Sequence, residues 1–169
     1  VSHNLIESAK LMAAATKAAA KGIIVQHGMQ RRSDEGWAAA MQWVKEGHIG
    51  KAKLSHALVH GLRMSIDKVD AAQPPPATVD YKLWSAPRPE LPIMRKQFHN
   101  DRHWQWPYGG GDIGNQGIHE IDISRWGLEV TLPTKVSAIG GHFMFDDDQT
   151  TPNTMIANYE FDKGGKKVI

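Results

Sequence analysis

The segment 108–126 holds the side chains of this chain that are best suited to chemistry. Five of them follow at steps of three, four, three and four residues: Asp112, Asn115, His119, Asp122 and Trp126. On an α-helix these steps place all five side chains along one stripe. A carboxylate, an amide and an imidazole on one helix face, entered through the glycines 109–111, indicate a candidate site for a polar ligand.

Plainer interpretations stay open for two of these residues. Asp112 opens the helix, where a carboxylate satisfies free backbone N–H groups and the helix dipole. His119 could be a packed helix histidine. A neighbouring stripe is apolar and is expected to pack against a core; it consists of Gly114, Ile118, Ile121 and Leu128.

A second group of aromatic and cationic side chains comes just before the glycines: His99, Arg102, His103, Trp104, Trp106 and Tyr108. Sugar rings stack on indole, and His and Arg reach their hydroxyls, so this group is typical of a polyol pocket. We expect substrate contact for His103 and Trp104, and a core position for at least one other tryptophan. His99 and His103 have a possible metal-pair spacing, but no metalloprotease-like glutamate is adjacent, and we expect no metal here.

Composition excludes several classes of function. The 169 residues carry a net charge of +2 and no basic stripe with interleaved aromatics, so we expect no nucleic-acid partner. No apolar run is long enough to span a membrane. Cysteine is absent, which excludes disulfides and thiolate catalysis. We therefore expect a globular chain without a membrane association.

The elements that position these residues change character along the chain. A capping box at Asn4 and Glu7 predicts a helix to about Lys21, with Gly22 after its end. Residues 23–26 predict a short buried strand. A second helix is expected from Ser33 to Gly47, and residues 51–61 predict another strand.

Beyond these elements, residues 63–92 are proline-rich and predict a long irregular excursion. Strands are expected at 135–145 and 153–161, and the turn Lys163-Gly-Gly165 predicts a hairpin. The fold class is thus α+β, with a mostly antiparallel open sheet packed by helices and a helix–strand piece in front of it.

Several short motifs occur in a familiar order: Ser2-His-Asn4, Gln26-His-Gly-Met-Gln-Arg-Arg32, Glu46-Gly-His-Ile-Gly50, Leu83-Trp-Ser-Ala-Pro87, Phe98-His-Asn-Asp-Arg-His-Trp-Gln-Trp106 and the Gly-Gly-Gly-Asp…His…Asp segment. Together they resemble the glucose–fructose oxidoreductase / inositol dehydrogenase (Gfo/Idh/MocA) family, and most closely its bacterial subgroup with a tryptophan-rich insertion. The likeness covers nearly the whole chain. Each motif alone is weak, whereas their order is specific.

The resemblance implies an α/β parent with a Rossmann domain that binds NAD or NADP, followed by a substrate domain whose open sheet often builds homo-oligomers. Residues 1–30 are then expected to be the tail of the Rossmann domain and residues 31–169 the substrate domain, incomplete at its C-terminus. The family's phosphate-binding glycine turn between the first Rossmann strand and helix is not found here, nor is its Glu-Lys-Pro motif, which normally comes just before the position of Val1. We therefore expect a piece of a longer protein that does not bind a dinucleotide by itself.

The resemblance also assigns roles. His119 matches the family's catalytic histidine, which bonds the substrate oxygen at the carbon that exchanges hydride, and imidazole is suited to proton transfer near neutral pH. Asn115 stands where many members have an aspartate and can orient a hydroxyl. Gln30 and Arg31 are expected near the cofactor and Arg32 near the substrate, at a strand's carboxyl end; an exposed turn with ion pairs is the alternative.

Two further roles stay open beside plainer ones. Trp84 resembles a family tryptophan near the cofactor, but it could equally anchor the long loop. Asp122 could fix the tautomer of His119 or cap a neighbouring group.

These observations predict an NAD(P)-dependent oxidoreductase of a sugar, inositol or related polyol. One alternative is a redox-neutral, glycosidase-like elimination in which no NADH accumulates. A second alternative is a non-catalytic module for carbohydrate binding or oligomerisation, and a third, a metal-dependent His-based hydrolase, needs a bound metal. We expect a cytoplasmic location, or a periplasmic one if an export signal precedes the chain.

Overall fold

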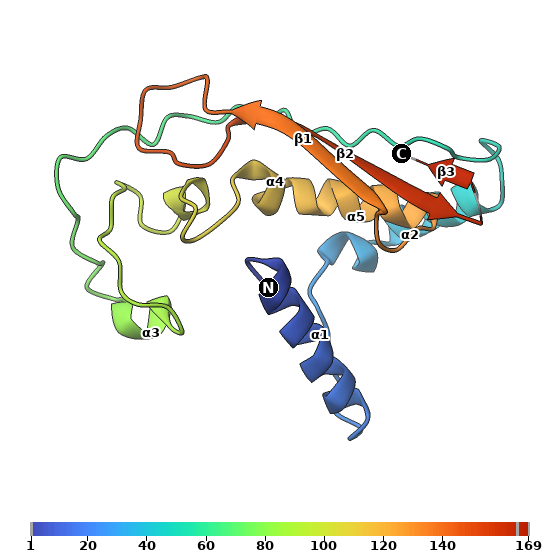
Figure 1. Ribbon diagram of the computed structural model, residues 1–169, viewed down its shortest axis with the longest axis horizontal. Helices are drawn as coiled ribbons and strands as arrows, with labels where there is room; N and C mark the ends of the chain where they lie inside the picture. The colour runs from blue at the N-terminus through green and yellow to red at the C-terminus, as the bar shows by residue number, and fades with distance from the viewer. Residues whose placement is uncertain (1, 165, 169) are drawn as a thin grey trace. The chain divides into compact units, whose positions relative to one another are not determined.

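The computed structural model describes residues 2–164 and 166–168 (Figure 1). The chain forms two compact units. Unit 1 comprises Val1–Ala57, His119–Lys135 and Tyr159–Ile169, and unit 2 comprises Leu58–Ile118 and Val136–Asn158. Residues on both sides of position 30 belong to unit 1, so the units do not follow the predicted domain boundary, which stays a prediction.

Helix α1, Leu5–Ala19, forms as the sequence predicts. The Asn4 side chain accepts a hydrogen bond from the Glu7 backbone N–H at 2.9 Å, while the Glu7 carboxylate accepts one from the His3 N–H at 2.6 Å. After the helix, Gly22 adopts φ 73°, a left-handed conformation that glycine takes without strain. Local signals alone therefore set both ends of this helix.

Helix α2, Glu35–Lys45, is preceded by the short 3₁₀ helix η1, Gln30–Ser33. The predicted cap was Ser33, but the structure uses Asp34, whose carboxylate accepts from the Trp37 N–H at 2.9 Å. A carboxylate caps as well as a hydroxyl does, and η1 occupies Ser33. Gly47 follows the helix with φ 88°, as predicted.

The strands predicted at 23–26 and 51–61 are wrong, because neither segment belongs to a ladder in the described part of the chain. Ile24 is 93% exposed, against the expectation of a buried strand. A strand needs a neighbouring strand to bond its backbone groups. The apolar pattern of these segments does not supply that neighbour, so they stay extended and irregular.

The sheet has the order β1-β2-β3, formed by β1 (Lys135–Gly141), β2 (Thr154–Lys163) and β3 (Lys166–Val168). Strands β2 and β3 pair antiparallel, with Lys163 opposite Lys166, which confirms the predicted hairpin; its Gly165 lies outside the described residues. Strand β1 ends at Gly141, earlier than predicted, where the Gly141 carbonyl accepts from the Asn153 N–H.

Each unit has a small core. Among the residues whose burial the structure describes, the buried apolar side chains of unit 2 are Ile66, Ile93, Phe98 and Trp104, and those of unit 1 are Leu128 and Phe161. The proline-rich excursion is mostly irregular, as predicted, but it contains helix α3, Tyr81–Ser85. No helix within the described residues is both long and apolar enough to cross a membrane.

The helix predicted for the glycine-rich segment is divided in two. Helix α4 spans Asp112–Asn115 and helix α5 spans Gly117–Leu128, with Gln116 as the break (Figure 1). Glycines before and after the break weaken helix propensity there. The break disturbs the predicted apolar stripe: Leu128 is buried, but Ile118 is 42% exposed and Gly114 is also exposed, so their expected core packing is wrong.

Candidate functional site

His119 stands in the first turns of α5, and η1 brings Gln30 to it. The Gln30 Nε2 atom lies 3.3 Å from the His119 Nε2 atom. The other ring nitrogen, Nδ1, is buried and has no hydrogen-bond partner among the described residues. Two residues that are 89 positions apart in sequence therefore meet, and the imidazole has an amide as its polar neighbour.

Two ion pairs fix η1 against α5 on either side of this contact. Arg31 binds Glu120 through Nη1 at 2.5 Å and Nη2 at 2.7 Å. Arg32 binds Asp122 through Nε at 2.7 Å and Nη2 at 2.8 Å. Such fork-to-carboxylate pairs fix both distance and orientation. The turn 30–32 is thus held in register with residues 119–122.

Aromatic rings support both guanidinium groups. The Arg31 guanidinium carbon lies 5.5 Å from the centre of the Trp37 ring, and that of Arg32 lies 4.6 Å from the Trp126 ring. These are cation–π distances. Trp126, the last member of the predicted stripe, therefore packs on Arg32.

The ion pairs also shift the ionisation of their members. The hydrogen bond from Arg32 holds the pKa of Asp122 below its usual value, although partial burial opposes this shift. The bonds to Glu120 and Asp122 raise the pKa of Arg31 and of Arg32 above the already high value of a guanidinium. Both pairs therefore act as fixed, charged clamps near neutral pH.

In unit 2, Asp112 is also paired. Arg63 donates from Nε and Nη2 to the two Asp112 oxygens, at 2.8 and 3.0 Å. Arg63 was missed in the sequence because 49 residues separate it from Asp112 and no motif surrounds it. Asn115 lies exposed at the end of α4.

The glycines 109 and 111 allow close packing beside His103. A Cβ atom on Gly109 would lie 2.7 Å from the His103 Cα atom, and one on Gly111 would lie 3.0 Å from the Thr151 Oγ1 atom. Burial lowers the pKa of His103, whose Nδ1 contacts the Asn100 carbonyl at 2.8 Å. Its Nε2 is buried without a partner among the described residues.

Trp104 and Tyr108 lie in packed surroundings. Trp104 is only 4% exposed, and its carbonyl accepts from the Thr150 and Thr151 N–H groups. The Tyr108 hydroxyl lies 3.1 Å from that of Tyr81. The sugar contact expected for Trp104 stays a prediction, while its burial matches a core tryptophan.

A buried arginine, which the sequence did not reveal, organises the aromatic residues of this region. Arg95 is 1% exposed, and its guanidinium carbon lies 4.7 Å from the ring of Tyr108, 4.9 Å from that of Phe98 and 5.5 Å from that of Trp84. Trp84 thus packs within this aromatic group, and its expected place near the cofactor stays a prediction. Nearby, Arg102 donates to the His99 carbonyl at 3.0 Å.

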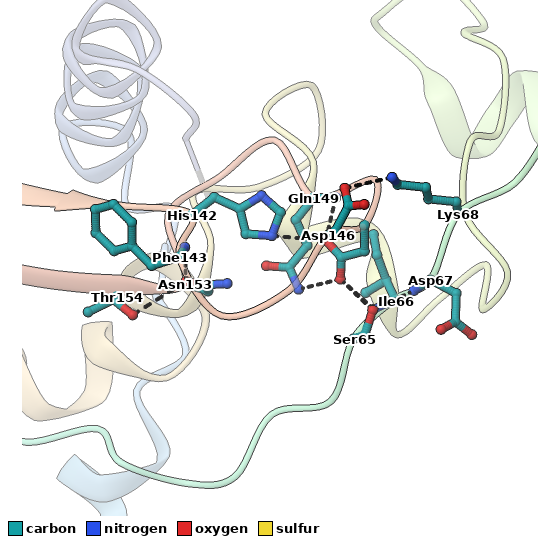
Figure 2. A network of polar contacts seen from close by, with 11 residues as sticks. Ser65, Ile66, Asp67, Lys68, His142, Phe143, Asp146, Gln149, Asn153 and Thr154 are labelled. Carbon is teal, nitrogen blue, oxygen red and sulfur yellow. Dashed lines mark hydrogen bonds and ion pairs between the residues drawn. The ribbon is translucent and has the colours of Figure 1, made fainter.

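A polar network that the sequence also did not reveal centres on Asp147, whose side chain is fully buried. Ser65, His142 and Gln149 all contact it, and Figure 2 shows these three side chains close together in one polar network. Ser65 Oγ donates to Oδ2 at 2.8 Å, and His142 Nε2 lies 3.0 Å from Oδ1. The network ties the loop after β1 to residues 65–69, with Asp148 accepting from the Val69 N–H.

The glycine turn does not match a dinucleotide site, although Gly109, Gly111 and Gly114 have the Gly-x-Gly-x-x-Gly spacing of a phosphate-binding turn. The turn follows the 3₁₀ helix η2, Asp101–Trp104, rather than a strand. The Asp112 carboxylate within it would repel a pyrophosphate. This turn therefore does not fit the phosphate end of NAD or NADP.

A metal centre and an apolar pocket are two other kinds of site. No cluster of three potential metal ligands occurs among the residues that the structure describes. Unit 1 has an open apolar hollow, lined in part by Met41, Leu54 and Gly127. His119 does not line this hollow.

Comparison with known proteins agrees with the motifs. The family model described as "Oxidoreductase family, C-terminal alpha/beta domain" (GFO_IDH_MocA_C2) matches residues 63–168. No curated protein matches the chain. The match covers more than half of the chain, including the glycine turn, α5 and the sheet, and it confirms the resemblance drawn from the sequence. The chain belongs to the Gfo/Idh/MocA oxidoreductase family and carries its C-terminal α/β domain.

Proposed function

We propose that the protein acts as an NAD(P)-dependent oxidoreductase on a sugar, inositol or related polyol. His119 accepts the proton of the substrate hydroxyl in this proposal. The observation that carries this proposal is the contact of His119 with Gln30 on a helix fixed by two ion pairs, in a chain of this oxidoreductase family. A nicotinamide, when bound, would accept the hydride from the carbinol carbon.

In this proposal the residues of this chain act on the substrate hydroxyl. The His119 ring would accept the hydroxyl proton, because imidazole exchanges protons near neutral pH. Arg31 and Arg32 would act through Glu120 and Asp122, since their guanidinium groups are bound to these carboxylates. Their contribution is to hold the turn rather than to bind a phosphate.

The test compares His119→Asn with the control His48→Ala, whose imidazole is exposed and lies beside Glu46. The assay follows NAD(P)H formation with a panel of inositols and monosaccharides, in the longer protein whose Rossmann domain the family resemblance implies. We expect His119→Asn to lower kcat by about 100-fold or more, since a positioned acid–base group contributes that much, while the control keeps the parent rate. Equal rates for the two variants would overturn the assignment of His119.

The same assay separates the alternatives. If a glycosylated substrate gives product while no NAD(P)H accumulates, the reaction is a redox-neutral elimination and not a net dehydrogenation. If the protein binds a polyol saturably but does not turn it over, it is a binding module and not an enzyme.

We propose further that the protein assembles with copies of itself through the sheet. Apolar side chains on β1 and β2 are exposed, notably Ile139 at 76% and Ile156 at 64%. Exposed apolar patches of this kind mark interaction surfaces. Light scattering of the purified protein would show a mass above that of one chain, and a monomer would refute the assembly.

A further inference from the structure

The catalytic histidine proposed above needs a neighbour that decides which ring nitrogen carries the proton. A neutral imidazole has one N–H donor and one bare acceptor nitrogen, and the group bonded to the ring selects between them. In many sites a carboxylate takes this role. Two carboxylates, Glu120 and Asp122, stand close to His119 in the sequence of α5.

Both carboxylates already accept hydrogen bonds from arginine side chains. The two oxygens of Glu120 accept from Arg31, and those of Asp122 accept from Arg32, at distances of 2.5 to 2.8 Å. The side chain of Asp122 is only 12% exposed. Turning it toward His119 would break two charge-assisted bonds and leave Arg32 without its carboxylate. The sequence-based alternative that Asp122 fixes the tautomer is therefore not what the geometry shows.

Gln30 is the side chain in contact with the ring. Its Nε2 group faces the His119 Nε2 atom at 3.3 Å. An amide NH₂ can only donate, so this contact requires a bare lone pair on the ring Nε2 and places the proton on Nδ1. Nδ1 is buried, which leaves Nε2 as the nitrogen that a hydroxyl can reach.

We infer that Gln30 is a positioning residue: its amide donates to Nε2 and so holds His119 in the Nδ1–H tautomer, and a substrate hydroxyl that displaces the amide then finds Nε2 unprotonated and able to accept its proton. This inference rests on the proposed function for the proton's destination, but the tautomer itself exists without turnover. The ion pairs of Arg31 and Arg32 supply the register that brings Gln30 to the ring.

The test is ¹⁵N NMR of the histidine rings in the protein, comparing the parent with Gln30→Ala and Gln30→Glu near neutral pH. Gln30 is exposed, so neither substitution opens a core. We expect the parent to show Nε2 bare and Nδ1 protonated. Gln30→Ala should lower the ratio of the two tautomers by about fivefold, as expected for one neutral hydrogen bond. The carboxylate introduced by Gln30→Glu can only accept, so that variant should reverse the ratio.

The control is Gln42→Ala, which removes an exposed glutamine that donates to Glu46 on α2 and should leave the His119 signals unchanged. If Gln30→Ala and Gln30→Glu also leave them unchanged, the inference is overturned. Activity then separates the two proposals. Altered tautomers in an inactive protein would refute the oxidoreductase alone. A large loss for His119→Asn, with unaltered tautomers in the Gln30 variants, would refute the positioning role alone.

Discussion

Replacing the buried Asp147 should destabilise unit 2 by an amount that its contacts allow us to estimate. Oδ2 accepts from the Ile66 N–H at 2.9 Å, besides Ser65 Oγ, and Oδ1 accepts from the Gln149 N–H at 3.1 Å. Ile66 and Gln149 are both buried. Asp147→Ala would leave these two backbone donors unpaired, at about 1–3 kcal/mol each, so we expect a loss of roughly 2–6 kcal/mol.

The matched variants are Asp147→Asn and Asp146→Ala. An asparagine oxygen can keep the donors at Oδ2, but its NH₂ then faces the Gln149 N–H and His142, so the loss should be about half of that for alanine. Asp146 is 92% exposed and pairs with Lys68 at the surface, and its removal should leave the free energy of unfolding unchanged (Figure 2).

Urea denaturation of the three variants provides the measurement, and its pH dependence provides a second check. Burial alone raises the pKa of Asp147, but the bonds from Ser65, Gln149 and Ile66 outweigh it and hold the pKa below its ordinary value. The stabilisation should therefore be complete above the unfolded pKa of about 3.9 and be lost as pH falls through the lower folded pKa. If Asp147→Ala lost no more stability than Asp146→Ala, the reasoning would be refuted.

Two further outcomes follow from the structure. Arg32 holds the pKa of Asp122 down, so Asp122→Asn should lose less than about 1 kcal/mol of stability near neutral pH, because Arg32 is 41% exposed and screened. That loss should vanish as pH falls through the lowered folded pKa; a loss that persists in acid, measured by thermal melts across pH, would contradict the ion-pair account. Gly109→Ala should cost about 1–3 kcal/mol, since its Cβ atom would lie 2.7 Å from the His103 Cα atom, whereas Gly110→Ala meets nothing within 4 Å. Equal melting temperatures for these two variants would show that the turn is not packed as described.

Features that depend on neighbouring residues in the sequence were predictable. The Asn4–Glu7 pair marks the start of α1 and Gly22 follows its end, while Gly47 follows α2. Caps and left-handed glycines act within one turn of chain, so the local sequence is enough to predict them. The β2–β3 hairpin has its signal in the turn that joins the strands. The order of motifs also identified the family.

Features that depend on distant partners were not predictable. Residues 23–26 have a strand's composition, but a ladder needs a neighbour that composition does not supply. The contact of Gln30 with His119 joins segments 89 residues apart. The burial of Arg95 had no signal, because its support comes from aromatic rings that folding gathers around it.

The proposed chemistry can be tested directly by following the hydride. The longer protein, with the Rossmann domain that the family resemblance implies, would be incubated with NAD⁺ or NADP⁺ and a polyol that carries deuterium on its carbinol carbons. The nicotinamide would then be analysed by mass spectrometry. The account predicts deuterium in the reduced nicotinamide, at a rate that falls sharply in His119→Asn. Oxidised polyol without deuterium in the nicotinamide, or an equal rate of transfer in the variant, would contradict it.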